Sequence, residues 1–130
     1  MTITWIKNQM EEEKLTKRII GCCFKVHREL GPGFNEKIYH TALKLEFKQE
    51  GLRFQTEKEF EVSYLDQRVG TFRADLVVED KVVLEIKSLE GKVSMIFGYQ
   101  LLSYLKASGL RVGLLVNFGN KSCQVKRLVY

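Results

Sequence analysis

Three charged side chains are the residues of this sequence most suited to chemistry: Asp75, Glu85 and Lys87. Alternating apolar and polar residues around them predict two strands joined by a turn at residues 79–81. Glu85 and Lys87 are two positions apart on one strand and therefore share a face. Because a hairpin places Asp75 beside Glu85 on the neighbouring strand, we expect two carboxylates and an ammonium group to converge.

Such a cluster has two interpretations. Converging carboxylates suit a hard cation such as Mg²⁺, which takes oxygen ligands and keeps several waters. Glu85 and Lys87 also interrupt the most apolar strand of the sequence, residues 82–87, where charge is costly without a purpose. The alternative is an exposed strand edge, on which a Glu–Lys ion pair contributes under about 1 kcal/mol. The charge pattern alone leaves both interpretations open.

Two helices are predicted to precede these strands. Apolar residues at steps of three and four favour a helix over residues 9–30, with Asn8 and Glu11 as a capping box at its start. The segment Gly31-Pro32-Gly33 interrupts it, since Pro removes a hydrogen-bond donor and Gly favours turns. A second helix is then expected over residues 35–50.

The rest of the chain predicts a sheet. Residues from 54 to 64 and from 71 to 78 alternate as strands around a turn at residues 66–67. Further elements are expected as a strand at 82–87, a helix at 94–108, and strands at 112–116 and 123–130. The strands at 82–87 and 112–116 should be parallel, because a helix connects them. The order α-α-β-β-β-α-β-β predicts an α/β fold with a mixed central sheet flanked by helices.

Composition restricts the class of protein. The 130 residues are 45% hydrophobic and contain a single Pro, which favours one globular domain over residues 1–130. A formal charge of +5 favours a polyanionic partner without establishing one. Three cysteines without C-x-x-C spacing argue against a zinc or redox site and favour a reducing compartment. Since no apolar run suits a signal peptide or a membrane span, we expect a cytoplasmic protein without membrane contact.

The strand motif resembles a known superfamily. Asp75, followed after a short hairpin by Glu85-Ile86-Lys87, a helix and a buried parallel strand, is similar to the PD-(D/E)XK core of restriction-enzyme-like nucleases. Ala74 occupies the position of the Pro in that name, which carries no chemistry. Residues 33–39 read G-x-x-E-x-x-Y, the signature of the GxxExxY protein family within this superfamily. The similarity runs from about residue 21 to 129, and departures cluster at residues 91–99.

The resemblance implies a restriction-endonuclease-like fold and a metal site. Asp75 and Glu85 would bind Mg²⁺ or Mn²⁺, and Glu36 would complete the shell directly or through water. Lys87 would orient the attacking water and neutralise charge on the phosphate, which makes these four residues the expected catalytic set. Glu36 taken alone has a simpler explanation, because a carboxylate in the first turn of a helix contributes about 0.3–1 kcal/mol through the helix dipole.

Substrate contacts are expected beside this set. Gln100 and Tyr104 lie four residues apart on the helix at 94–108, hence on one face, and resemble the Q-x-x-x-Y element that contacts nucleic acid or braces the catalytic Lys. Arg73, on the strand of Asp75, is a candidate phosphate contact. Tyr39 and His27 are interpreted as structural residues.

The expected function is metal-dependent hydrolysis of phosphodiester bonds in a nucleic acid, with DNA favoured over RNA. One alternative is an inactive nuclease-fold module that binds nucleic acid or a protein partner. Another is a hydrolase of a different phosphoester, although no nucleotide-binding fingerprint accompanies the site. The sequence leaves a homodimer open.

Overall fold

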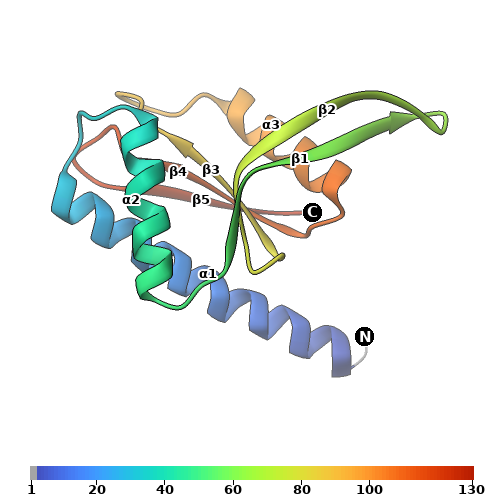
Figure 1. Cartoon of the computed structure of the whole chain (residues 1–130), viewed down its shortest axis with the longest axis horizontal. Helices are drawn as coiled ribbons and strands as arrows, with labels where there is room; N and C mark the ends of the chain where they lie inside the picture. Colours follow the sequence, from blue (N-terminus) through green and yellow to red (C-terminus); the bar gives the residue numbers. More distant parts are fainter. Residues whose placement is uncertain (1–2) are drawn as a thin grey trace.

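The computed structural model describes residues 3–130. They form one five-stranded sheet in the order β1-β2-β3-β4-β5, with helices on both sides (Figure 1). The elements along the chain are α1 (Ile3–Leu30), α2 (Glu36–Gln49), β1 (Phe54–Tyr64), β2 (Gln67–Val78), β3 (Val82–Lys87), α3 (Met95–Ser108), β4 (Val112–Asn117) and β5 (Gln124–Val129). The predicted α/β class and element order are confirmed.

The centre of the sheet is the β3–α3–β4 crossover. β3 and β4 pair in parallel from Val82 opposite Val112 to Lys87 opposite Asn117, as expected for strands joined by a helix. The other three neighbouring pairs are antiparallel, so the sheet is mixed. Because β3 is central, every residue of this strand except Lys87 is buried.

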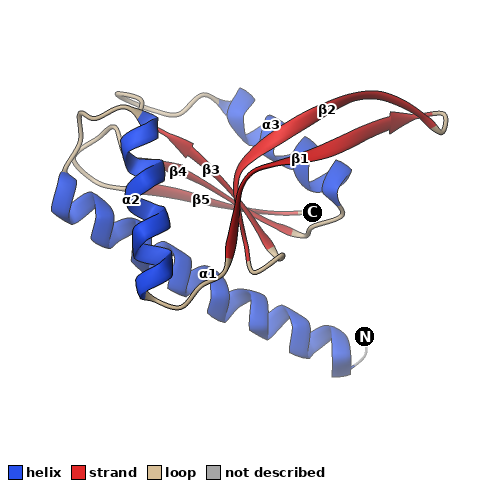
Figure 2. Cartoon of the chain, in the orientation of Figure 1, coloured by secondary structure: helices blue, strands red, loops and turns tan. Residues whose placement is uncertain are grey.

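Helices cover the two faces of the sheet unequally, as Figure 2 shows. α1 and α2 lie on one face, where Leu43 and Phe47 join sheet residues such as Leu84 in the larger hydrophobic core. α3 lies on the other face, where Leu101 and Leu105 form a smaller core with sheet residues. Among residues 3–130, no helix combines the length and the apolar character needed to traverse a lipid bilayer.

The start of α1 differs from the prediction. In the described part of the chain the helix begins at Ile3, so Asn8 lies inside it and the predicted capping box is wrong. Tertiary contacts explain the longer helix: the Arg111 guanidinium lies 5.6 Å from the Trp5 ring centroid, and Arg111 Nη1 lies 3.9 Å from Glu12 Oε1. β2 begins at Gln67, four residues before the predicted start at 71, whereas the other helix and strand ends agree within one or two residues. The first hairpin turn falls one residue earlier than predicted, at Leu65 and Asp66.

The sheet face reverses within β2. Leu76 belongs to the core under α1 and α2, whereas Ala74 belongs to the core under α3, although residues two apart normally share a face. The reversal is therefore located at Asp75. The predicted strict alternation along this strand is wrong at this point.

β1 reverses at the matching position. Phe54 packs on the core under α1 and α2, whereas Phe60 packs on the core under α3. The paired residues on either side are Thr56 and Lys58, which leaves Glu57 at the reversal, and its φ of 50° lies in the left-handed region. Beyond this point the β1–β2 hairpin leaves the sheet and runs on as an arm alongside α3 (Figure 1).

Candidate active site

The acidic pair lies where β2 and β3 separate. Backbone pairing between these strands runs from Val78–Val82 to Leu76–Leu84. At the next position Glu85 Oε1 accepts a hydrogen bond from the Asp75 main-chain N–H (3.1 Å), and Asp75 Oδ2 accepts one from the Ile86 main-chain N–H (2.8 Å). At this position the two carboxylates accept hydrogen bonds in place of the backbone pairing between β2 and β3. They lie side by side, as the predicted hairpin implies.

Burial makes this pair electrostatically unfavourable. Glu85 is only 6% exposed. Burial raises the pKa of Glu85 to about 8, and repulsion from Asp75 adds to the rise, whereas Lys87 opposes it. Both carboxylates can therefore be ionised together only at a cost that the one ammonium group does not offset, and a bound cation would lower this cost.

Lys87 ends β3 beside the pair. Its Nζ lies 4.4 Å from the centroid of the Phe97 ring on α3, within cation–π distance. The aromatic face supports the ammonium without accepting its protons, which leaves them available to a water or a phosphate oxygen. Sequence reasoning missed Phe97, because an apolar residue on a helix gives no signal of a contact with a cation.

Glu36 approaches from the opposite side of the strands. It is the first residue of α2, whose N-terminus is capped by the Asn35 side chain, which accepts a hydrogen bond from the Ile38 N–H (3.2 Å). Glu36 and Asp75 line the same cavity of about 500 Å³, between α2 and the β1–β2 hairpin. His40, one turn further along α2, places Nε2 3.0 Å from the Asp75 carbonyl oxygen and ties the helix to β2.

Tyr39 explains the spacing of the G-x-x-E-x-x-Y segment. Its buried ring stacks on Phe118 with centroids 4.5 Å apart. Its hydroxyl donates to the Gly31 carbonyl (2.5 Å) and accepts from the Phe34 N–H (3.3 Å). The loop before α2 is thus fixed to the end of the sheet, which sets the position of Glu36. His27 is buried against the same Phe118 ring, in agreement with a structural role.

The three predicted substrate contacts have different surroundings. Tyr104 stacks on Phe72 with centroids 4.1 Å apart. Its pKa is raised by burial and then by the charges of Glu85 and Asp75, which places its phenol near the acidic pair. Gln100 is exposed one turn earlier on α3. Arg73 instead lies 3.7 Å from Glu59 Oε2, in an exposed ion pair on the hairpin.

The donor set fits a divalent cation of the magnesium type. Within residues 3–130 no three acidic, His or Cys side chains already meet at one point, so Glu36 is not yet in contact with the pair. Mg²⁺, however, is commonly held by one or two carboxylates and keeps several waters. Asp75 and Glu85 each use one oxygen in the reciprocal hydrogen bonds, and the cavity leaves room for waters between Asp75 and Glu36.

Several polar residues of this cavity were not singled out from the sequence. They are Lys37, Thr41 and Lys44 on α2, and Thr56 and Glu57 on β1. Helical spacing from Glu36 would have indicated only His40, four residues on, because Lys37, Thr41 and Lys44 lie one, five and eight residues after Glu36. The position of Glu57 at this cavity depends on the register of the strands, which the sequence alone does not show.

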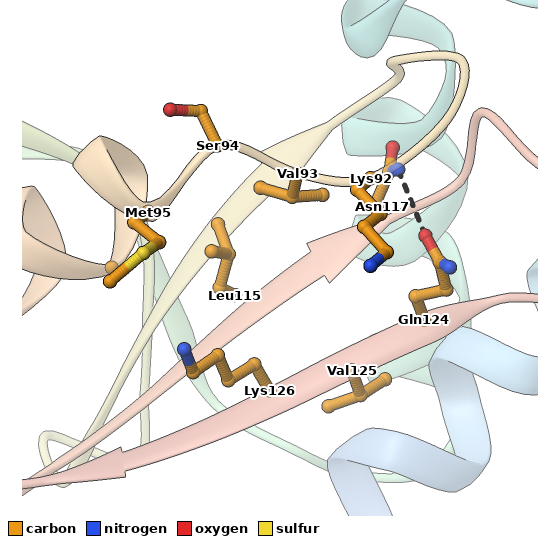
Figure 3. Close-up of a pocket in the computed structure, with 10 residues that line it drawn as sticks. Lys92, Val93, Ser94, Met95, Leu115, Asn117, Gln124, Val125 and Lys126 are labelled. Atoms are coloured by element: carbon orange, nitrogen blue, oxygen red, sulfur yellow. Dashed lines mark hydrogen bonds between the residues drawn. The ribbon is translucent and has the colours of Figure 1, made fainter.

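A second cavity lies on the other side of the sheet end. It has a volume of about 230 Å³ between the start of α3 and strands β4 and β5, and Figure 3 shows Lys92 and Lys126 at its wall. Asn117 in this wall is already engaged, since its Nδ2 donates to Gln124 Oε1 (3.2 Å) and to the Leu89 carbonyl (2.9 Å). None of the predicted site residues lines this cavity.

Comparisons with known proteins agree with this geometry. No curated protein matches the chain. The crystal structure of SSO0001 is similar, with a TM-score of 0.55 and 24% identity over 72% of this chain. At that identity the likeness shows the fold alone, and the alignment spans only 48% of the SSO0001 chain. A sequence model of the PD-(D/E)XK nuclease superfamily matches residues 13–128, which include all the elements of the site. The chain belongs to the PD-(D/E)XK nuclease superfamily.

Proposed function

We propose that this chain is a metal-dependent nuclease that hydrolyses phosphodiester bonds in DNA, or in RNA, at the Asp75–Glu85 pair. The observation that carries the proposal is the reciprocal hydrogen bonding of these carboxylates beside Lys87. Membership of a nuclease superfamily supports the reaction class. The G-x-x-E-x-x-Y segment at residues 33–39 supports a narrower classification of the chain, as a member of the GxxExxY family within this superfamily.

Each residue has a distinct role in the proposed reaction. Asp75 and Glu85 hold a Mg²⁺ or Mn²⁺ ion, and Glu36 contributes across the cavity through water. When bound, the cation supplies a water of lowered pKa and polarises the phosphoryl oxygen. Lys87 orients the attacking water and stabilises charge developing on the phosphate, as a preorganised donor in a partly buried site does. Gln100 and Tyr104 of α3 contact the nucleic acid or brace Lys87, as the resemblance implies.

Two broader features accompany the proposal. Both hydrophobic cores lie against the same sheet, which supports a single domain. The three cysteines are free, which supports a reducing, cytoplasmic environment.

The test is cleavage of labelled single- and double-stranded DNA and RNA with Mn²⁺, Mg²⁺ or chelator. We expect Lys87→Ala to lose about 10²-fold or more in rate, the scale of losing one preorganised charge-stabilising group. Its metal affinity, measured by calorimetry, should remain near that of the wild type, because an ammonium cannot ligate a cation. Lys17→Ala, on the exposed side of α1, is the matched control and should cleave normally.

Two results would contradict this proposal in different ways. Equal cleavage by wild type and Lys87→Ala would remove the role of Lys87 and leave the nuclease assignment. No metal-dependent cleavage by the wild type on any of the four substrates would contradict the nuclease proposal and leave the binding module and the hydrolase of a different phosphoester.

A further inference from the structure

We propose that the nucleic-acid strand to be cut lies along α2, with its phosphates on Lys37 and Lys44, and enters the site from the α2 side of the sheet. This inference rests on the proposed function, since it names where the substrate of that same site binds. The strand would follow the 500 Å³ cavity that contains Glu36 and Asp75.

The shape of the cavity favours a chain-like ligand. One wall is α2, on which Lys37, Thr41 and Lys44 follow one another at i, i+4 and i+7 on a single face. The other wall is formed by Thr56 and Glu57 of β1. At about 1.5 Å rise per residue, Lys37 and Lys44 are about 10.5 Å apart along the helix, which matches about three nucleotide steps of 3.4 Å in a B-form strand.

Charge favours a polyanion on this wall. Neither Lys37 nor Lys44 forms an ion pair among residues 3–130, whereas Lys25, on the neighbouring α1, is paired with Glu46 of α2 at 3.1 Å. Lys44 is half-buried, whereas Lys37 is exposed, and both line the cavity. The cavity also contains the carboxylates of Glu36, Glu57 and Asp75, which a bound cation would partly neutralise, so the two ammonium groups of α2 can contact a phosphate backbone on its way to that cation.

The opposite approach, over α3 and the hairpin arm, passes a stack of aromatic side chains. Phe60, Phe72 and Tyr104 form a continuous aromatic stack there, with successive centroids 5.2 and 4.1 Å apart. Beyond Glu57 and Asp75 the hairpin arm, residues 58–74, carries three basic and three acidic side chains, so it has no net charge although the whole chain has +5. Arg73, the one basic residue expected here from the sequence, is paired with Glu59. The arm therefore supplies no net positive charge to attract a phosphate backbone.

The cavity in Figure 3 is the main competitor. Lys92 and Lys126 give it positive charge as well. No carboxylate lines it, and the Asn117 amide is already bonded to protein. A phosphate bound there would not share a wall with either member of the acidic pair, which is why we place the strand on α2.

The experiment measures binding as a function of salt. Fluorescence anisotropy with a labelled 20-nucleotide oligomer, single- and double-stranded, is recorded in EDTA so that cleavage does not compete. K37Q/K44Q is compared with wild type and with K14Q/K17Q, a control that removes two exposed lysines from α1. Gln keeps the helix propensity of Lys, so folding should be preserved in both. K92Q/K126Q tests the competing cavity.

Loss of two phosphate contacts should make the slope of log K against log salt shallower by about 1.4 for a single strand or 1.8 for a duplex. We expect this change in K37Q/K44Q and not in K14Q/K17Q. An unchanged slope in K37Q/K44Q, or a loss confined to K92Q/K126Q, would overturn the inference.

The outcome separates the inference from the proposed function. If the wild type cleaves but K37Q/K44Q keeps its slope, the nuclease stands and the α2 path is wrong. If the salt slope of K37Q/K44Q is shallower than that of the wild type, but the wild type cleaves no substrate with any metal, then α2 binds nucleic acid and the enzyme proposal is wrong. Failure of the wild type to bind any of these oligomers would overturn both.

Discussion

At Glu85, burial and charge repulsion act in the same direction. The raised pKa of about 8 means that, without a cation, this side chain keeps its proton through the neutral range. A carboxyl buried beside a second carboxylate destabilises the folded state whenever it ionises. The residue is thus suited to binding a cation and poorly suited to stabilising the metal-free protein.

The first prediction at this scale concerns Glu85→Gln in EDTA. The folded state holds the Glu85 proton up to a pKa of about 8, against 4.5 in the unfolded chain, so wild-type stability falls as pH rises through that window. Gln removes this loss while its Oε1 still accepts from the Asp75 N–H. Relative to wild type, the free energy of unfolding of the variant should rise by up to about 1.4 kcal/mol per pH unit between pH 4.5 and 8. Urea unfolding at several pH values measures it.

Glu79→Gln is the control of opposite sign. The Arg53 guanidinium lowers the pKa of Glu79, so the ionised form stabilises the fold above the unfolded pKa and this contribution is lost as pH falls. This variant should therefore be less stable than wild type at neutral pH and equal to it in acid. If the free energy of unfolding of Glu85→Gln exceeded that of the wild type by the same amount at every pH, the difference would come from packing and not from ionisation.

At the scale of elements, the reversal at Glu57 and Asp75 positions the site. Because Ala74 and Leu76 lie on opposite faces, Asp75 is at the crossing point, where its side chain reaches toward β3. The same residue lines the α2 cavity and raises the pKa of Tyr104 on the α3 side. A regular strand would expose Asp75 to only one of these sides.

The strained residue at the reversal gives a second prediction. A non-Gly residue in the left-handed region costs about 1–3 kcal/mol, whereas Gly in a regular strand costs about 0.5–1 kcal/mol in chain entropy. Glu57→Gly, at φ 50°, should therefore keep or raise stability. Glu61→Gly, an exposed position on β1 paired with Thr71, should lose about 0.5–1 kcal/mol. Chemical denaturation measures both variants, and an equal loss in their free energies of unfolding would contradict backbone strain at Glu57.

Periodicity predicted which elements exist, but not this reversal. The alternation that indicated β2 continues through Phe72, Ala74, Leu76 and Val78 with no break in residue type. Only the backbone rotation at Glu57 and Asp75 changes the face, and a Glu with positive φ has no signature like that of Gly. The start of α1 was missed for a related reason, since its extra turns are held by Arg111 from a distant part of the chain.

At the scale of the whole molecule, the candidate site depends on the complete fold. Glu36 comes from a helix on one face, and Asp75 and Glu85 come from two strands that are separating. The sequence predicted Asp75 beside Glu85, because a short hairpin connects them. The approach of Glu36 could be expected only by resemblance, since its position depends on the stacking of Tyr39 on Phe118, 79 residues later.

This dependence predicts that metal binding stabilises the whole chain. A ligand that binds only the folded state adds about 2.7 kcal/mol to the free energy of unfolding at a concentration one hundred times its Kd. The melting temperature of the wild type should therefore rise by several degrees with Mn²⁺. Asp75→Asn keeps an oxygen for the Ile86 N–H but lacks the charge, and should lose most of the Mn²⁺ shift. Glu36→Gln should lose less, because its carboxylate lies across the cavity from the pair. Asp66→Asn, in the exposed hairpin turn, should respond like the wild type. Equal Mn²⁺ shifts in wild type and Asp75→Asn would place the cation elsewhere and remove Asp75 as a ligand.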